Sequence, residues 1–255
     1  MIKNYAALAS FYDQLMAHVE YDDWSAYIKK ILDTYCSSPE PSLIEIGGGT
    51  GRLGEKLAEK GMNYQGSDFS FAMCKQARNR GVKFFVADAR FFPVKKHIYD
   101  MAIFLYDGIN YLQSIQEYFV TFENIHACLK SGGLFLFDIT TQYNSTTNFN
   151  EFNDTGDLGD YFYFRHSYYD MAEAIQYNDF TIFTKQTNPD ASDDLMPVFY
   201  KYNEHHAQKV PPVAAIKKAI PEKLFDIIGI WEGFSFKRHS SRSVRVHFLL
   251  RKKSA

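Results

Sequence analysis

The sequence lacks any long apolar run. No stretch of its 255 residues approaches the roughly 18 consecutive apolar residues that a membrane helix needs. The N-terminus also lacks a basic segment followed by an apolar one, the pattern of a secretory signal. We therefore expect a cytoplasmic protein. Its length and its pI near 6.4 are typical of a single domain with an elaboration, large enough for a sizeable core.

Cysteine is also scarce. The chain has three cysteines, Cys36, Cys74 and Cys128, which are widely spaced and form no CxxC pair. An odd number at this spacing argues against a disulfide framework and against a zinc site built on paired cysteines. We expect three reduced structural thiols and no metal.

The most informative segment runs from Leu43 to Leu53. Leu43 to Ile46 is a short apolar run that contains an acid and predicts a buried parallel strand. Three glycines follow, and then a helix begins. Glycines beyond the carboxyl end of a strand let the backbone turn sharply and approach a ligand closely. The segment predicts a site for a nucleotide-type cofactor.

Two glycine frames compete within this segment. The string Gly49-x-Gly51-x-x-Gly54 matches a dinucleotide fingerprint, which places a pyrophosphate on amides at a helix N-terminus. This match begins three residues after the strand, and Glu45 would bring a carboxylate close to the pyrophosphate. In the frame Glu45-x-Gly47-x-Gly49-x-Gly51 the first glycine follows the strand directly. An acid beside the loop suits a cofactor with a positive end, such as S-adenosylmethionine.

Two later acids favour the second frame. Asp68 ends the next predicted strand, where a carboxylate can accept hydrogen bonds from both ribose hydroxyls. Asp88 ends a third strand, where it could accept a hydrogen bond from an adenine amino group. Ser70 can cap the helix after Asp68, while Phe69 and Met73 offer apolar surface to an adenine ring. Asp68 alone does not distinguish an S-adenosylmethionine site from an NAD site, because NAD enzymes also have an acid that binds the ribose about 20 residues past the glycines.

These motifs resemble those of the class I S-adenosylmethionine-dependent methyltransferases, over most of the chain. The likeness is strongest to the small-molecule branch, which includes glycine and amino-sugar N-methyltransferases. The resemblance implies S-adenosylmethionine as cofactor and S-adenosylhomocysteine as product. In that branch a segment resembling residues 8–24 closes over the cofactor, which makes Tyr12 a lid candidate. The cofactor-binding residues implied are Tyr12, Glu45, Gly47, Gly48, Gly49, Gly51, Asp68, Phe69, Met73, Asp88, Ala89, Leu105 and Tyr106.

The order of predicted elements indicates an α/β fold, a doubly wound seven-stranded sheet of the Rossmann-like methyltransferase type. We expect residues 1–139 and 210–255 to form the core, with residues 1–38 as a helical lid. Residues 140–209 are expected to form a β-rich insertion over the substrate. Helices are predicted at 24–35, 51–60, 70–80, 114–130 and 213–219. Core strands are predicted at 43–46, 63–68, 82–89, 134–138, 224–231 and 243–251, with a fourth strand and its following loop at 99–112. Antiparallel strands are predicted at 161–169, 173–185 and 197–209, and a loop at 140–159.

The insertion is acidic and aromatic. Residues 150–204 hold eleven acids against three Lys and Arg, whereas residues 205–255 hold eleven Lys and Arg against three acids. One interpretation is two solvated surfaces of opposite sign. The other is an acidic lid that attracts a cationic small molecule such as an amine. Tyr and Phe number 18 and 23 in the whole chain, so the insertion could cover a partly aromatic pocket or a second subunit in a homodimer.

Residues 200–208 carry the candidate catalytic groups. Strand alternation places Tyr202, Glu204, His206 and Gln208 on one face, and puts His205 on the opposite side. A metal site of two histidines is therefore not indicated. A histidine can take a proton from an acceptor near neutral pH, so His206 and Tyr202 are predicted catalytic residues. The alternative is a solvent-facing strand with an ordinary histidine.

The loop after the fourth core strand supplies a third candidate. Asp107, with Asn110, would lie beside the transferring methyl, although Asp107-Gly108 is also an ordinary turn pair. The predicted reaction is direct in-line transfer of a methyl group to a small-molecule acceptor, most simply an amine nitrogen. The enzyme would align the reactants, exclude water and keep the acceptor deprotonated.

Three other functions compete with this prediction. A nucleic-acid methyltransferase could use the basic C-terminal stretch, but residues 106–109 are not the Asn/Asp-Pro-Pro-Tyr/Phe of exocyclic base methylation and the net charge is −2. The case for an NAD-dependent oxidoreductase rests on the Gly49-x-Gly51-x-x-Gly54 frame alone. The sequence shows no catalytic Tyr-x-x-x-Lys pair for that reaction. A catalytically silent cofactor-binding protein would carry the same binding motifs.

Overall fold

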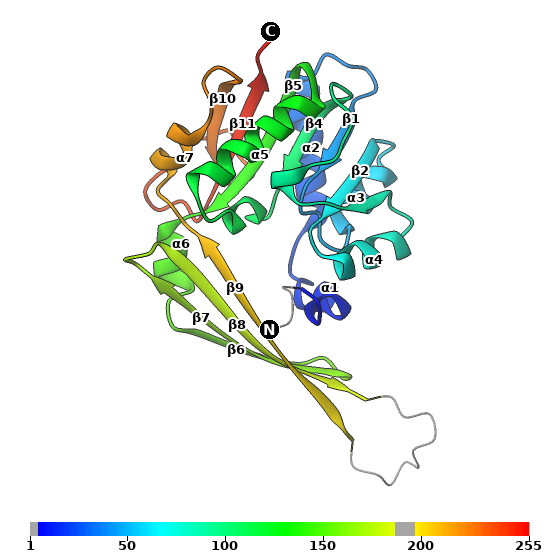
Figure 1. Cartoon of the computed structure of the whole chain (residues 1–255), viewed down its shortest axis with the longest axis vertical. Coiled ribbons are helices and arrows are strands. Elements are labelled where there is room, and N and C mark those ends of the chain that lie inside the picture. The colour runs from blue at the N-terminus through cyan, green and yellow to red at the C-terminus, as the bar shows by residue number, and fades with distance from the viewer. Residues whose placement is uncertain (1–4, 187–196, 255) are drawn as a thin grey trace.

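The computed structural model describes residues 5–186 and 197–254, and its larger sheet has seven strands (Figure 1). Their spatial order is β10-β11-β5-β4-β1-β2-β3. The strands are β1 Ser42–Glu45, β2 Asn63–Asp68, β3 Phe84–Val86, β4 Tyr99–Phe104, β5 Leu129–Thr140, β10 Phe225–Glu232 and β11 Arg245–Lys252. β11 runs antiparallel to both neighbours, and the pairs from β5 to β3 are parallel. The predicted doubly wound, seven-stranded α/β sheet is confirmed.

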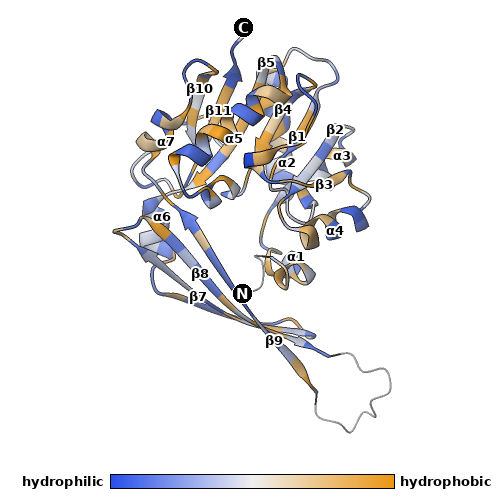
Figure 2. Ribbon diagram, in the orientation of Figure 1, coloured by the Kyte–Doolittle hydropathy of each residue, from blue (hydrophilic) through white to orange (hydrophobic). Residues whose placement is uncertain are grey.

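Helices cover both faces of this sheet (Figure 1). One core cluster packs α5 against one face and contains Phe122, Phe135 and Phe137. The other packs α2 and α3 against the opposite face. In Figure 2 the apolar residues gather along the strands of this sheet, as expected when both faces are buried. The helices are α1 Tyr12–Leu15, α2 Tyr21–Tyr35, α3 Arg52–Glu59, α4 Phe71–Asn79, α5 Ile115–Cys128, α6 Gln142–Asn148 and α7 Val213–Ala219, with 3-10 turns η1 Leu8–Ser10, η2 Ala89–Phe91 and η3 Gly108–Tyr111.

A second sheet projects from the first as a long antiparallel arm (Figure 1). It contains β6 Phe152–Asp157, β7 Tyr161–Asp170, β8 Ile175–Lys185 and β9 Phe199–Lys209. The predicted strands at 161–169, 173–185 and 197–209 are therefore confirmed, within a few residues at their ends. The N-terminal segment packs against the arm: Leu8 and Phe11 form a cluster with Tyr163, Phe180 and Ile182.

The prediction of a loop over residues 140–159 is wrong. Thr141 accepts a hydrogen bond from the backbone N–H of Asn144 at 3.1 Å and so caps α6, and β6 follows. Each residue of β6 has a register partner in β7. The residues here have low propensity for helix or strand. The cap at Thr141 nevertheless stabilises α6, and pairing with the predicted strand β7 stabilises β6.

Over the described residues, no helix has both the length and the apolar character needed to cross a lipid bilayer.

Gly51 illustrates how the glycine-rich segment is built. Its φ of +79° lies in the left-handed region, and it immediately precedes α3. A Cβ at this position would lie 2.9 Å from Cβ of Ala77 on α4, so only glycine lets these two helices pack.

This geometry makes a stability prediction with a matched control. Gly61 also has a positive φ, +76°, but nothing lies within 4 Å of a Cβ placed there. Gly61→Ala carries only backbone strain and should lower the free energy of unfolding by about 1 kcal/mol. Gly51→Ala adds the collision with Ala77 and should lower it by roughly 2–4 kcal/mol. Urea unfolding measures both values, and equal losses would refute the packing role.

Candidate active site

Loops at the carboxyl ends of β1, β2, β3 and β4 enclose a cavity of about 470 Å³. Open parallel sheets bind their ligands at this edge. We call it the cofactor cavity. Its lining is Tyr5, Tyr12, Ile46, Gly47, Gly49, Asp68, Phe69, Ser70, Met73, Ala87, Asp88, Ala89, Arg90, Phe104, Leu105, Tyr106, Gly108, Tyr111 and Leu112.

The glycine loop forms one wall of the cofactor cavity. Gly47 and Gly49 both have positive φ, at +66° and +57°. The first atom that a Cβ on Gly49 would meet is 3.9 Å away, on Tyr12, so the loop presents bare backbone to the cavity. A nucleoside group can approach such backbone closely, which fits the adenosyl group that the motif predicted.

Asp68 faces this wall from the end of β2. Its Oδ2 accepts from the backbone N–H of Gly49 at 2.9 Å, and its Oδ1 accepts from that of Ser70 at 2.7 Å. Each oxygen keeps a free lone pair, as a carboxylate needs in order to accept from two ribose hydroxyls. Burial raises the pKa of Asp68 to about 6, against the lowering effect of these two N–H groups.

The expected adenine surface is also assembled here. Met73 is buried, whereas Phe69 lines the cavity with 62% of its surface exposed, so a bound ring could cover it. Asp88 is bound by Arg90, with Nη2 and Oδ2 2.7 Å apart. Burial acts to raise the pKa of Asp88, but the hydrogen bonds from Arg90 outweigh it and hold that pKa below its usual value.

Three predicted cofactor residues do not line this cavity. Glu45 is buried behind the loop, where it accepts a hydrogen bond from Tyr64, and burial raises its pKa to about 7. Glu45 and Gly48 line only a neighbouring hollow of about 60 Å³. A Cβ on Gly48 would lie 2.7 Å from Oε2 of Glu45, so this glycine makes room for the acid. Gly51 serves helix packing, as described above. These three lie outside the lining of the cofactor cavity, and their binding of the cofactor stays a prediction.

A second cavity, of about 420 Å³, lies between the arm and the core, and we call it the acceptor cavity. It shares Tyr5, Tyr12, Tyr106 and Tyr111 with the cofactor cavity, so four tyrosines form the boundary between the two spaces. The rest of its lining is Leu8, Leu15, Met16, His18, Asp107, Thr140, Asn144, Ser145, Phe149, Asp154, Tyr163, Arg165, Gln176, Asn178, Phe180, His206, Gln208 and Arg245.

A hydrogen-bonded chain crosses this boundary. The hydroxyls of Tyr5 and Tyr111 are 2.6 Å apart, and the Tyr111 hydroxyl is 3.0 Å from Nδ1 of His206. Nε2 of His206 is 3.1 Å from Oε2 of Glu204. Burial raises the pKa of Tyr5 and of Tyr111, so both hydroxyls stay protonated at neutral pH. Donation can run from Tyr5 through Tyr111 to His206 and on to Glu204.

Glu204 also fastens the N-terminal segment. Its carboxylate accepts backbone N–H bonds from Tyr5 at 2.6 Å, Ala7 at 2.6 Å and Leu8 at 3.1 Å. Burial acts to raise the pKa of Glu204, but the hydrogen bonds from His206 and from these N–H groups lower it below the usual value. One carboxylate on β9 therefore positions the segment that carries Tyr5, and this segment leads directly into α1 and Tyr12.

Asp107 is held in a second buried charge cluster. Its Oδ1 lies 2.5 Å from Nη1 of Arg245, which also pairs with the fully buried Asp138. Gln208 donates to Oδ2 of Asp107 at 3.1 Å. Tyr106 and Asp107 both have positive φ, +59° and +53°, an unusual conformation for two successive residues other than glycine. Arg245 holds this bend, since its guanidinium also lies 4.7 Å from the ring of Tyr106.

The structure separates the other predicted catalytic residues. His206 is 2% exposed and faces the acceptor cavity, while His205 points outward and pairs with Asp179, as the alternation predicted. Tyr202 lines neither cavity. It lies four residues before His206 on β9 and packs near the cluster of Leu8 and Phe11, so the lining of the two cavities does not support its predicted role.

Asn110 also lines neither cavity. It is fully buried, donates to the carbonyl of Lys209 at 2.7 Å and accepts from the N–H of Thr140 at 3.2 Å. These bonds tie the loop after β4 to β5 and β9. Sequence reasoning gave no role to Tyr5 or Tyr111 and counted Arg165 only as a charge. Tyr111 lies in the loop after β4. Since that strand was predicted, its loop was the one signal in the sequence that could have pointed to Tyr111.

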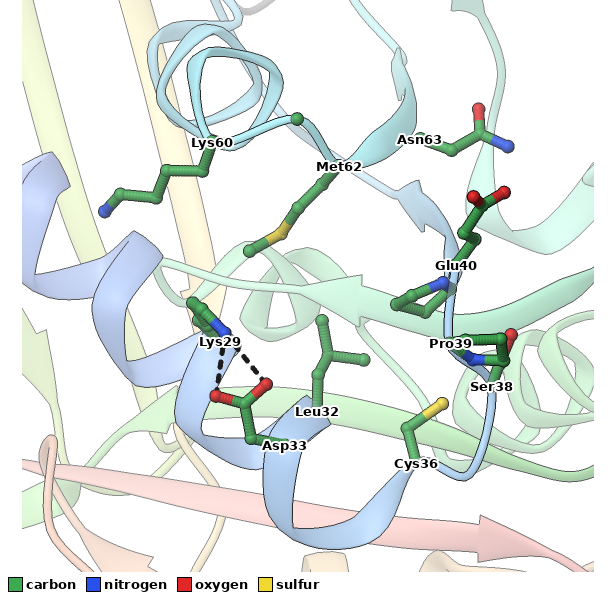
Figure 3. Close-up of a pocket in the computed structure, with 12 residues that line it drawn as sticks. Lys29, Leu32, Asp33, Cys36, Ser38, Pro39, Glu40, Lys60, Met62 and Asn63 are labelled. Atoms are coloured by element: carbon green, nitrogen blue, oxygen red, sulfur yellow. Dashed lines mark hydrogen bonds and ion pairs between the residues drawn. The ribbon is translucent and has the colours of Figure 1, made fainter.

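Another cavity, of about 620 Å³, is not part of this site. It lies beside Ser42 and Asn63, where β1 and β2 begin, at the opposite edge of the sheet. In Figure 3 its lining is mostly loop residues, and Lys29 and Asp33 pair with each other. Within residues 5–186 and 197–254, no group of three His, Cys, Asp or Glu side chains is arranged to hold a metal ion.

Comparison with known proteins agrees with this geometry. Residues 43–133 match a family described as a methyltransferase domain. YqeM of Bacillus subtilis (strain 168) is 26% identical over 97% of this chain and 97% of its own length.

Solved structures share the fold along nearly the whole chain. A crystal structure of an S-adenosylmethionine-dependent methyltransferase from Clostridium acetobutylicum has a TM-score of 0.80 at 20% identity, covering 99% of this chain and 100% of that one. The sugar N-methyltransferase KedS8 from Streptoalloteichus has a TM-score of 0.73 at 14% identity, covering 95% and 93%. The resemblance drawn from the sequence motifs is confirmed. Residues 43–133 thus match a methyltransferase domain, and the chain has the fold of solved S-adenosylmethionine-dependent methyltransferases.

Proposed function

We propose that this protein transfers the methyl group of S-adenosylmethionine to an amine nitrogen of a small molecule held in the acceptor cavity. The observation that carries the proposal is the boundary of four tyrosines shared by the two cavities. A donor in one cavity and an acceptor in the other would face each other across this boundary. Direct in-line transfer needs that arrangement and little else.

The cofactor cavity offers a matching set of contacts. We assign the adenosyl group to the backbone at Gly47 and Gly49, its ribose to Asp68 and its adenine to Phe69 and Met73. Asp88, Ala89, Leu105 and Tyr106 complete the lining. When bound, S-adenosylmethionine supplies a methyl group on a sulfonium, which is a good leaving group. Tyrosine ring faces at the boundary attract positive charge, so they favour the cationic end of the cofactor there.

Residues around the boundary would then exclude water and remove a proton from the acceptor. The N-terminal segment with Tyr5 and Tyr12 excludes water from the boundary. Tyr111 can accept a proton from the acceptor nitrogen while it passes its own to Nδ1 of His206. Glu204, next to Nε2 of His206, stabilises the imidazolium that results. Asp107 is placed at the wall of the acceptor cavity, where Arg245 and Gln208 hold it.

The competing functions have less support. The acceptor cavity lies under the arm and the N-terminal segment, a setting that suits a small molecule better than a nucleic-acid strand. An oxidoreductase would need the dinucleotide frame, yet Gly51 and Gly54 pack against Ala77 and Tyr64 rather than lining the cofactor cavity.

Calorimetric titration of the purified protein with S-adenosylmethionine, S-adenosylhomocysteine and NAD tests the cofactor. We expect both adenosyl ligands to bind and Asp68→Ala to lose this binding, because the ribose loses its acceptor. Asp33→Ala, at an exposed acid on α2, is the control and should bind normally. Binding of NAD alone would contradict the proposal.

The same titration should depend on pH. The raised pKa of Asp68, about 6, means that the carboxyl is partly protonated below that pH and then has fewer lone pairs for the ribose hydroxyls. Affinity should therefore rise with pH through about 6 and level off above it. An affinity that stays constant from pH 5 to pH 8 would argue against the ribose assignment.

Glu204→Gln tests the fastening of the N-terminal segment. An amide keeps only one acceptor oxygen and turns an NH₂ toward backbone donors, at a cost of about 1.5–3 kcal/mol for hydrogen bonds to a buried charge. We expect cofactor affinity to fall roughly tenfold or more and chymotrypsin, whose sites include Tyr5, Phe11 and Tyr12, to cleave the N-terminal segment faster. Glu173→Gln, at an exposed position between β7 and β8, should change neither. Unchanged protection in Glu204→Gln would refute the role.

His206→Ala tests proton removal. It should lower kcat by roughly 10²- to 10⁴-fold while leaving cofactor affinity nearly intact, since His206 does not line the cofactor cavity. Tyr202→Ala is the matched control on the same face of β9 and should turn over normally. Methylation of an amine panel with labelled S-adenosylmethionine gives both rates. Cofactor binding without methylation of any acceptor by the unaltered protein would indicate a catalytically silent protein.

A further inference from the structure

Arg165 is the unusual charge in the acceptor cavity. It lies on β7 and lines the cavity, largely covered by aromatic rings. Its Cζ is 5.2 Å from the ring centre of Phe149, 5.6 Å from that of Phe152 and 5.6 Å from that of Phe180. Such surroundings stabilise a cation through the ring faces, but they also remove most of its water.

The hydrogen bonds of Arg165 go to neutral oxygens. Its Nε is 2.9 Å from Oγ of Ser167, and its Nη2 is 2.6 Å from Oδ1 of Asn178. Nη1 has no hydrogen-bond partner within the described part of the chain. The guanidinium is thus oriented by β7 and β8 and retains donors for another group.

No carboxylate among residues 5–186 and 197–254 lies within 4 Å of this guanidinium. Asp154, in the same cavity, accepts from the hydroxyl of Tyr163 at 2.9 Å. Burial lowers the pKa of Arg165, although Asp154 acts in the opposite direction. A largely buried cation without an anion is costly, so its retention calls for an anion that the chain itself does not supply.

Arg245 provides the comparison. It lines the same cavity but pairs with both Asp107 and Asp138, and so has no charge left to satisfy. Two buried polar atoms on the cavity wall lack partners within the described residues, Oγ of Ser145 and Oε1 of Gln176, and of these only the hydroxyl could donate to an anion. With Arg165, these groups come from α6, β7 and β8, and all of them line the acceptor cavity.

We propose that Arg165 binds an oxyanion of the methyl acceptor, so that the substrate is a small molecule carrying both a nucleophilic nitrogen and a carboxylate or phosphate. This inference rests on the proposed function and names its substrate class. A planar guanidinium fork matches either oxyanion with two parallel hydrogen bonds. Arg165 then fixes one end of the acceptor, while Tyr111 and His206 receive the nitrogen at the other.

This assignment replaces the expectation of a cationic substrate drawn into an acidic lid. Glu151, Asp157, Asp160 and Glu173 are exposed to solvent, and Glu204 is occupied by the N-terminal segment. Asp190, Asp193 and Asp194, which belonged to that expectation, lie outside the described residues. The cavity itself presents Asp154, the paired Asp107, and two arginines.

Ligand selectivity of the protein saturated with S-adenosylhomocysteine tests the proposal. The probes are benzoate, phenyl phosphate, benzamide and benzylamine, which share a ring that suits the aromatic wall and differ in charge. Calorimetry should show benzoate or phenyl phosphate binding about tenfold or more tightly than both benzamide and benzylamine. The stronger of the two anions identifies the oxyanion as carboxylate or phosphate.

Variants locate the binding. Arg165→Met should weaken the preferred anion about tenfold or more and leave S-adenosylhomocysteine affinity unchanged. Arg165→Lys keeps the charge but loses the guanidinium fork, so its affinity for the anion should lie between those of the unaltered protein and Arg165→Met. Arg242→Met, at an exposed arginine before β11, is the control and should bind as the unaltered protein does.

Three results would overturn the inference: equal or tighter binding of benzamide or benzylamine, no measurable binding of either anion, or full anion affinity in Arg165→Met. The comparison of probes on the unaltered protein decides the matter even if Arg165→Met fails to fold. If the unaltered protein does not bind S-adenosylhomocysteine, that result contradicts the proposed function itself. Failure of the proposed function is thereby distinguished from failure of the inference about Arg165.

Discussion

The architecture of the site depends on one buried carboxylate. Glu204 is 2% exposed, and a carboxylate at that depth is tolerated only when its lone pairs are filled. The donors are three backbone N–H groups of the N-terminal segment and one histidine nitrogen. The arm, the N-terminal segment and His206 are therefore coupled. Displacing the segment would leave a buried charge without its donors, so the carboxylate that holds the segment in place is also the one that holds His206.

A second cluster links the same region to the main sheet. Arg245 on β11 neutralises Asp138 on β5 and Asp107 in the loop after β4. The loop bends through two successive positive φ angles, a strain that persists only where the surroundings impose it. The bend presents Tyr106 to both cavities. The core thus places one boundary tyrosine through Arg245, and Glu204 helps place another, Tyr5.

Sequence reasoning predicted the features that depend on local pattern. Apolar runs and glycine positions gave the sheet, and the acids at strand ends gave Asp68 and Asp88 because parallel strands end at one edge. It failed for Thr140–Gly159, where capping by Thr141 and pairing with β7 create structure that composition does not reveal. It did not foresee the surroundings of Glu45, since an acid beside the glycine loop could face either the ligand or the core, and here it accepts a hydrogen bond from Tyr64. Tyr5 and Arg165 were missed because their roles arise from contacts across distant parts of the chain.

Tyr202 shows why sharing a strand face is not enough. It has the same orientation as His206, but four residues of strand correspond to about 13 Å, which carries it beyond the cavity along the arm. The same alternation explains why the charge count of the insertion was misleading. A count over residues 150–204 adds the outward acids to the inward ones, although a period of two sends neighbours to opposite faces. On β9, His205 pairs outside with Asp179 while His206 faces the cavity. The charge that a ligand meets is set by the inward residues alone. Among the described residues that line the acceptor cavity, the cation Arg165 and the acid Asp154 both lack an ion pair.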